Sequence, residues 1–461
     1  MAIRESSYGY WSGGTGFVLV AAGAAIGIGN ITRLPYLASQ YGGGAFVLVF
    51  LLAVLVMGWP LLVSEMLLGR WARLDVVGGI GRLAAASGAR RGWHLGGWLM
   101  LVTAALILSY ISVVAGWTLS YTLRSAAGAL NGVDGEALRQ GFLYLAQDPE
   151  RSLAWHTMFM VMACVIVGQG VRDGIERAAR LLMAGAVVAV LTLLWFAIKR
   201  DGIEPALTMV LAFRFGDLGW RGVMEALFQA FYTVGIGAGA MFAISSYLPA
   251  SVSLPKVAGW VITSTLIFSG LGSLAVFGII LGSGQPPAPG LALIFQALPL
   301  ALPDGWAGIW PAVLFYGALT AVAMASAVAL LESVTLFLME RARTTRVFAA
   351  TSSAVLIWFL GLGTLLSFNV LEEVHLYGRT FFEWVQWATA RLLAPMTALL
   401  ICVFSARIMP PGLVAEAWGE EPGMSFRAWR ALLLYPARIG LIVLLFYCLG
   451  VIEAAASLWQ S

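Results

Sequence analysis

Two glycine-rich stretches carry residues whose chemistry is unusual for their surroundings. "GAAIGIGN" runs from Gly23 to Asn30 and "TVGIGAGA" from Thr233 to Ala240, each inside an apolar run. Glycine costs a helix interior roughly 1 kcal/mol relative to alanine, so clustered glycines favour unwinding. Unwound backbone in lipid needs protein, water or a ligand to satisfy its N–H and C=O groups. The stretches therefore predict breaks whose carbonyls can bind a cation and whose half-helix N-termini can bind an anionic group.

Close helix packing and a nucleotide-binding loop are two other interpretations of these glycines. Small residues also let membrane helices pack closely, and this alone would explain either stretch by itself. It explains less well a pair that recurs at matching positions five helices apart, the pattern typical of a transporter's central binding site. A nucleotide-binding loop would need a strand before the glycines and a helix after them with the full spacing, and neither stretch has that context.

The composition requires a membrane for most of the chain. Of 461 residues, 60% are hydrophobic and 11% charged, whereas soluble domains are about 25% charged. Apolar runs of roughly 20 residues, enough to cross a bilayer, recur along the sequence. We expect an all-α integral membrane protein with about 11 transmembrane helices. Their predicted ranges are 13–38, 43–68, 95–125, 154–170, 175–198, 220–247, 256–282, 306–339, 345–366, 380–408 and 429–452.

The order of these helices predicts one transmembrane domain over residues 1–461. An offset of five spans between the two glycine stretches inverts the second set of helices relative to the first. We expect repeat 1 over about 11–200, repeat 2 over about 219–408 and an extra helix over about 429–452. The loops on the side of the N-terminus carry about twice as many Lys and Arg residues as those on the other side. This predicts a cytoplasmic N-terminus and an outer C-terminus.

The sequence gives no support for enzymatic chemistry. Its three cysteines, Cys164, Cys402 and Cys448, lie in apolar runs without metal-ligand or paired spacing. No Ser/His/Asp order, paired-carboxylate spacing or nucleotide motif stands out. The net charge of +4 says little about nucleic acid in a membrane protein. We expect a non-enzyme whose partners are a small-molecule substrate and the lipid bilayer, without nucleic acid, as a monomer or homodimer.

Several segments resemble a known family. "WSGGTGFVLVAAGAAIGIGNITRLPY", "YGGGAFVL" and "GWPLLVSEMLLGR" resemble, in order and spacing, the first two helices of the neurotransmitter:sodium symporter family. They are most similar to its bacterial amino-acid transporters of the leucine-transporter type. "AGWTL", "QAFYTVGIGAGA" and "SAVALLE" continue the match in the third, sixth and eighth helices. The resemblance implies a five-plus-five inverted repeat, with helices 1 and 6 unwound at mid-membrane, and sodium-coupled import of an amino acid or related small zwitterion by alternating access.

The resemblance also implies a set of site residues. Substrate contacts would come from Ala25, Gly27, Gly29, Ile107, Ile111, Tyr232, Gly235, Ala238 and Ser326. Sodium ligands would come from Gly23, Ala25, Ile26, Asn30, Thr233, Val322 and Ser326. Monoamine carriers of the family place an aspartate at the position of Gly27, and a glycine leaves room for a substrate that brings its own carboxylate. Tyr232 would be an aromatic lid above the substrate.

Some positions depart from the family pattern. Ile111 stands where the family has a carboxylate-binding tyrosine, and Tyr110 is one residue, about 100° of helix rotation, away. Whether Tyr110 replaces the missing tyrosine stays open. The seventh helix offers Val261 or Ile262 in place of an asparagine, and the eighth has Ala325 before Ser326. Hard cations depend on oxygen ligands, so we expect one or two weakened sodium sites and leave chloride open.

Three charged residues and one amide complete the predicted site. Arg33 would be the outer-gate cation, with Gln386 or Glu383 as its partner. Glu65 is a carboxylate inside a membrane span and is functional by default. The resemblance implies that it supports the unwound backbone through hydrogen bonds, and a proton-carrier role is the alternative.

Two further hypotheses remain beside the sodium-coupled importer. The same fold could take a non-amino-acid substrate or use altered or proton coupling, as Ile111 and the small residues Gly235 and Ala238 suggest. Alternatively, weakened ion sites would fit a transporter-like binding or sensor protein that does not transport.

Overall fold

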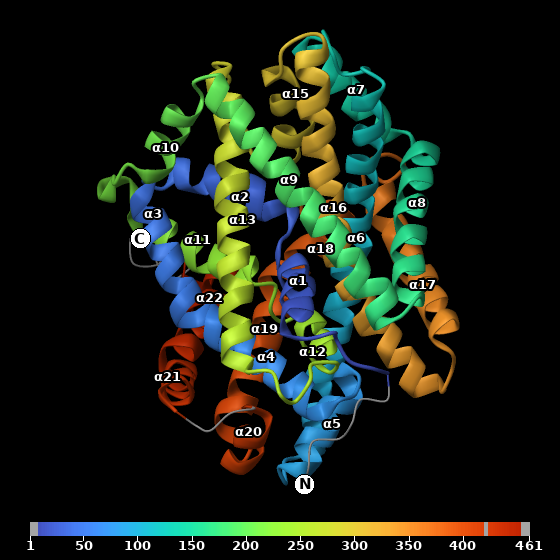
Figure 1. The fold of residues 1–461 in the computed structure, drawn as a ribbon, viewed down its shortest axis with the longest axis vertical. Coiled ribbons are helices and arrows are strands. Elements are labelled where there is room, and N and C mark those ends of the chain that lie inside the picture. Colours follow the sequence, from blue (N-terminus) through green and yellow to red (C-terminus); the bar gives the residue numbers. More distant parts are fainter. Residues whose placement is uncertain (1–7, 419–422, 453–461) are drawn as a thin grey trace.

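The computed structural model describes residues 8–418 and 423–452, and these form a helical bundle (Figure 1). Nine helical spans of this part of the chain are long and apolar enough to cross a membrane. The label η marks a short 3-10 helical segment (η2) or a short π-helical segment (the others). The spans are α3–η1–α4 (Gly44–Ala53, Val54–Gly58, Trp59–Ala72), η2–α6 (Arg91–Trp93, His94–Ala126), α8 (Pro149–Gly168), η3–α9 (Val171–Glu176, Arg177–Lys199), α13 (Leu254–Gly282), α16 (Trp306–Ala342), α17 (Arg346–Leu366), α18–η5–α19–η6 (Phe381–Trp387, Ala388–Leu393, Ala394–Val403, Phe404–Ile408) and α21–η7–α22 (Met424–Leu432, Leu433–Ala437, Arg438–Cys448).

The first and sixth predicted spans are the broken ones. Helices α1 (Gly14–Ala25) and α2 (Ile28–Gln40) meet at a bend of 58°. Helices α11 (Phe215–Thr233) and α12 (Ala240–Ser245) are separated by residues 234–239. Together with the nine spans, the broken α1–α2 pair is long and apolar enough to cross a membrane, and α11–α12 takes the place of the sixth predicted span in the described residues. The fold class is confirmed, whereas the boundaries of the two repeats stay predictions.

The two breaks have different local causes. At the first, Ile26 and Gly27 both adopt extended backbone, and an added Cβ at Gly27 would meet open space. At the second, Gly235, Gly237 and Gly239 have φ values of 66°, 90° and 71°. Residues with a Cβ rarely adopt such angles, so these three glycines end α11 and displace α12.

Shorter helices connect the spans. They are α5 (Val76–Ala86), α7 (Gly135–Gln147), α10 (Ile203–Leu211), α14 (Gly290–Ala292), η4 (Leu293–Ala297), α15 (Leu298–Ala301) and α20 (Pro411–Trp418). The hydropathy of the sequence does not predict them, because each is shorter than a membrane span. Local signals existed: Asp134 accepts a hydrogen bond from the Ala137 amide and thereby caps α7.

The broken helices lie in the interior of the bundle. Helix α1 packs against α13, α16 and α9, and α12 packs against α4 and α16. Figure 1 shows α1 near the centre of the view, with α7 and α15 at one end of the molecule and α5 and α20 at the other. Ala25 belongs to one buried hydrophobic cluster and Ile26 to a second, so the first break lies where the two clusters meet.

Candidate functional site

A cavity of about 590 Å³ opens beside the first break. Five of the nine predicted substrate residues line it: Gly27, Gly29, Ile111, Tyr232 and Ser326. Its walls come from α2, α6, α11, α16, α18 and η5, together with residues 289–294. The cavity thus extends from the helix break to α18 and to the segment that precedes α15.

The other four predicted substrate residues do not line the cavity. Ala25 and Ala238 are buried, and Ile107 is partly buried against the core. An added Cβ at Gly235 would lie 3.5 Å from the Ala25 Cα atom. Ala25 and Gly235 therefore hold the two breaks against each other, and at these positions the breaks contact one another instead of the cavity.

The N-terminus of α2 faces this cavity without a capping side chain. Gly27 is its N-cap, and within the described residues no side chain accepts a hydrogen bond from the first turn. Helix N-termini leave backbone N–H groups unpaired and carry a partial positive charge. This end of α2 can therefore bind the carboxylate of a molecule in the cavity.

The second break is different because a protein carboxylate already lies there. Glu65, fully buried in α4, accepts hydrogen bonds from the backbone N–H of Gly237 at 2.8 Å and of Phe242 at 3.3 Å. Thr397 from α19 donates to the Gly237 carbonyl at 2.5 Å. The unwound backbone before α12 is thus held by side chains of the protein itself.

Oxygen atoms that could bind a cation lie beside the broken helices at two places, of which the first includes Asn30. Its Nδ2 donates to the Ala25 carbonyl at 3.2 Å, while its Oδ1 is buried without a hydrogen-bond partner in the described part of the chain. Thr233 lines a small hollow together with Val261, Ile262 and Thr265, and the Thr265 hydroxyl is likewise buried and unpaired there. Unpaired buried oxygens of this kind suit a hard cation.

The second place surrounds Ser326 in α16. Its Oγ lies 3.2 Å, 3.4 Å and 2.9 Å from the carbonyl oxygens of Gly23, Ala24 and Ile26. Val322, one turn earlier, is fully buried. An added Cβ at Gly23 would lie 3.0 Å from the Ala325 Cβ, so the glycine lets α1 approach α16 closely enough for these oxygens to converge.

The predicted partner of Arg33 requires a correction. Arg33 forms an ion pair at 2.8 Å with Glu225 of α11, in place of Gln386 or Glu383. Glu383 accepts hydrogen bonds from the N–H and hydroxyl of Thr380 in a capping box at the start of α18. Gln386 and Glu383 line the cavity with Arg33, but the carboxylate of Glu383 is used by its own helix.

Tyr110 and Ile111 both line the cavity. The Tyr110 hydroxyl interacts with the side chains of Tyr232 and Thr389, and its ring lies edge-on to Phe382 at 6.1 Å between centroids. Helix α6 therefore brings both neighbouring residues to the same space.

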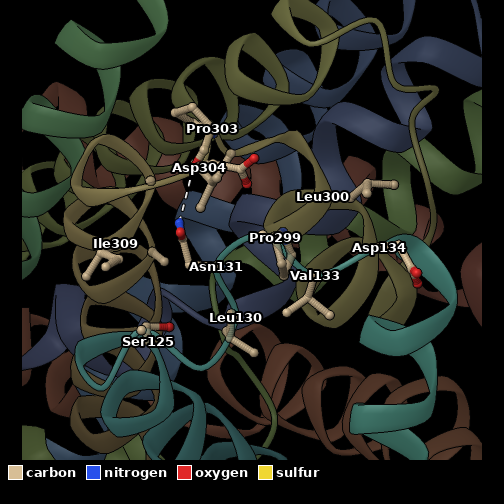
Figure 2. A pocket seen from close by; sticks show the side chains of 15 residues that line it. Ser125, Leu130, Asn131, Val133, Asp134, Pro299, Leu300, Pro303, Asp304 and Ile309 are labelled. Atoms are coloured by element: carbon tan, nitrogen blue, oxygen red, sulfur yellow. Dashed lines mark hydrogen bonds between the residues drawn. The ribbon is translucent and has the colours of Figure 1, made fainter.

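A second cavity lies away from these residues (Figure 2). It measures about 390 Å³ and is formed by residues 125–134 and 299–312. Asn131 crosses it, since its Nδ2 donates to the Gly305 carbonyl at 3.1 Å and its Oδ1 accepts from the Gly305 N–H at 2.7 Å. The cavity contains none of the predicted site residues, and Asn131 joins the two connecting segments.

Two broken helices around a cavity deep in a membrane bundle define a secondary transporter. The chain belongs to the sodium:neurotransmitter symporter family, whose model matches residues 8–134 and 145–424. It is 32% identical over 452 residues to an uncharacterized sodium-dependent transporter, YhdH, of Bacillus subtilis strain 168, covering 96% of this chain and 98% of that protein.

Two further comparisons name substrates of other proteins. The crystal structure of MhsT in complex with L-phenylalanine matches with a TM-score of 0.86 and 29% identity, over 95% of this chain and 99% of that one. The mouse sodium-dependent neutral amino acid transporter B(0)AT2 is 26% identical over 269 residues, covering 51% of this chain and 36% of that protein. The family resemblance expected from the sequence is confirmed.

Sequence analysis missed Glu225, Phe228 and Arg391. The guanidinium groups of Arg33 and Arg391 lie over the Phe228 ring, 4.8 Å and 5.3 Å from its centroid. A signal existed for Glu225, because a carboxylate inside a predicted membrane span is functional by default.

Proposed function

We propose that this protein is a sodium-coupled symporter that imports a neutral amino acid with an apolar side chain by alternating access. The observation that carries the proposal is the uncapped N-terminus of α2, which opens onto the cavity beside two groups of oxygen atoms. The helix end would bind the substrate carboxylate, and the oxygens would bind the ions that travel with it.

The cavity walls support the substrate class. Ile111, Val114, Phe228 and Ile294 line the cavity and favour an apolar side chain. Gly27 places no negative charge beside the helix end, which suits a substrate with a carboxylate of its own. The L-phenylalanine bound in the MhsT structure belongs to this class, and the mouse transporter is named for neutral amino acids.

Sodium would be transported together with the substrate in this cycle. One ion would use the Ala25 carbonyl, Asn30 and Thr233, and a second would use the carbonyls of Gly23 and Ile26 with Ser326. The unpaired Oδ1 of Asn30 and the converging oxygens around Ser326 support these assignments. Both ions would lie within one turn of the first break, so their binding would order the backbone that the substrate contacts.

The proposal also includes the domain organisation of the chain and its orientation in the membrane. The chain would be one domain of two inverted repeats, over about 11–200 and 219–408. It would lie in a bacterial inner membrane with its N-terminus in the cytoplasm, so that the cavity rim near Glu383 faces outside.

Uptake into proteoliposomes tests the proposal directly. With sodium outside, we expect accumulation of radiolabelled phenylalanine or leucine, and replacement of sodium by choline should abolish it. Uptake that is indifferent to sodium would remove the coupling. Thermal stabilisation by a betaine or a sulfonate, and by no α-amino acid, would contradict the substrate class.

A further inference from the structure

Glu225 forms the centre of a four-residue cluster at the wall of the cavity. Its Oε2 lies 2.8 Å from Arg33 in α2, and its Oε1 lies 3.6 Å from Arg391 in η5. Tyr447 of α22 donates a hydrogen bond to Oε1 at 2.8 Å. One carboxylate thus joins four segments that lie far apart in the sequence.

The burial of the cluster is uneven. The side chain of Glu225 is 9% exposed, whereas those of Arg33 and Arg391 are 31% and 34% exposed, and both arginines line the cavity. The carboxylate therefore lies behind the two guanidinium groups and holds them at the wall of the cavity.

The two cations are close enough to repel each other. Because each lies over the Phe228 ring, at 4.8 Å and 5.3 Å, their central carbons are separated by no more than about 10 Å, on the order of one Debye length. A single carboxylate between two such cations offsets this repulsion. Without it, α2 and η5 would carry two like charges close together at the wall of the cavity.

Helix α11 also connects this cluster with the substrate position. Phe228 follows Glu225 by one turn, and Tyr232 follows Phe228 by one further turn and stacks on it, with 6.1 Å between ring centroids. Residues spaced in this way share one face of a helix. A movement of Glu225 would therefore be passed along this face to the aromatic ring at the second break.

We propose that Glu225 is the acidic residue of the outer gate, and that it positions Arg33 and Arg391 so that the cavity can close on its outer side. This inference rests on the proposed transport function. It assigns to α11 the role that the sequence suggested for Gln386 or Glu383.

The test measures access to the cavity independently of uptake. The reporter is Ala323→Cys, at a residue of the cavity wall. It is introduced into a protein in which the three native cysteines have been replaced. In the purified transporter with sodium present, we expect Glu225→Gln to raise the rate of labelling by a small methanethiosulfonate reagent on the order of tenfold. Glu225→Asp should restore much of the wild-type rate.

Glu383→Gln is the matched control, since it removes a carboxylate that also lines the cavity. We expect its labelling rate to stay within about twofold of wild type, because a glutamine oxygen can still accept the hydrogen bonds of Thr380 in the capping box. A higher rate in Glu383→Gln with no change in Glu225→Gln would overturn the proposal. If Glu225→Gln does not fold, Tyr447→Phe is used in its place, because it keeps the carboxylate but removes the hydrogen bond that Tyr447 donates to it. An unchanged labelling rate in Tyr447→Phe would contradict the role of the cluster.

The labelling result is separate from the uptake result. Wild-type protein that fails to transport an amino acid contradicts the proposed function. Wild-type protein that transports, with a labelling rate unaffected by Glu225→Gln, contradicts only the role of Glu225.

Discussion

Gly27 is the N-cap of α2, lines the cavity and has open space where a side chain would begin. Its backbone is extended, which any residue can adopt, so neither φ nor packing requires a glycine here. The glycine instead leaves the partial positive charge of the helix end without a protein anion. At the scale of single residues, this absence of charge sets which molecules the cavity can accept.

Replacing Gly27 by aspartate should therefore exclude the substrate. Two carboxylates about 4 Å apart repel by roughly 4 kcal/mol at the effective dielectric near a protein surface, so we expect phenylalanine binding to weaken by at least about 100-fold. Equilibrium binding of radiolabelled phenylalanine to the purified protein measures this.

Gly27→Ala is the control for size, because its added Cβ would meet nothing within 4 Å. Binding to this variant should stay near the wild-type value. Equal losses in the alanine and aspartate variants would show that the position is limited by space and would contradict the argument from charge.

Individual contacts could be predicted only in part. The family motifs placed Ser326 beside the Gly23 and Ile26 carbonyls, and the structure has them within 3.2 Å and 2.9 Å. The partner of Arg33 could not be found in this way, because Glu225 is 192 residues distant and the expected acid was sought in another helix. Pairing across a bundle depends on how helices are rotated, which a motif does not fix.

At the scale of elements, the two breaks are held by different means. The first is an extended pair of residues between α1 and α2, whereas the second needs three glycines with positive φ. An added Cβ at Gly237 would lie 2.3 Å from the Ala394 carbonyl oxygen. The break before α12 is thus fixed against α19 by direct backbone contact.

Gly237→Ala should consequently destabilise the protein. A residue with a Cβ at φ of 90° costs about 1–3 kcal/mol in backbone strain alone, and the contact with Ala394 adds to this. We expect a fall of several degrees in the thermal unfolding midpoint in detergent, read by intrinsic fluorescence.

Gly259→Ala serves as the comparison for this prediction. Gly259 lies within α13 and an added Cβ there would meet nothing within 4 Å, so its midpoint should be unchanged or higher. A Gly237→Ala variant as stable as Gly259→Ala would mean that the backbone at the second break adapts freely.

The long helices were predictable because about twenty apolar residues have few alternatives in a membrane. The breaks were predictable because clustered glycines oppose a continuous helix. The connecting helices were not, since α7 begins at the Asp134 cap and α10 is held by packing against α13, and neither feature leaves much trace in hydropathy.

At the scale of the whole molecule, α5 and α7 lie at opposite ends of the bundle (Figure 1). The distribution of Lys and Arg predicts that α5 lies in the cytoplasm and α7 outside. Ala86 and Glu136 are exposed residues of these two helices and would mark the two sides of the membrane.

Labelling of single cysteines tests this orientation. In a cysteine-free background, a membrane-impermeant maleimide should label Glu136→Cys in intact cells, and Ala86→Cys only after permeabilisation. The reverse pattern would invert the proposed orientation and make the cavity rim cytoplasmic.

The carboxylate of Glu65 satisfies backbone N–H groups at the second break from within the protein, whereas no side chain of the described residues does so at the N-terminus of α2. Under the proposed transport function, the substrate would supply that missing carboxylate. One break would then be complete in the free protein, and the other would be completed once in each transport cycle by a molecule that later leaves. The cargo would be a temporary structural part of the protein, and each release would return the first break to an unfinished state.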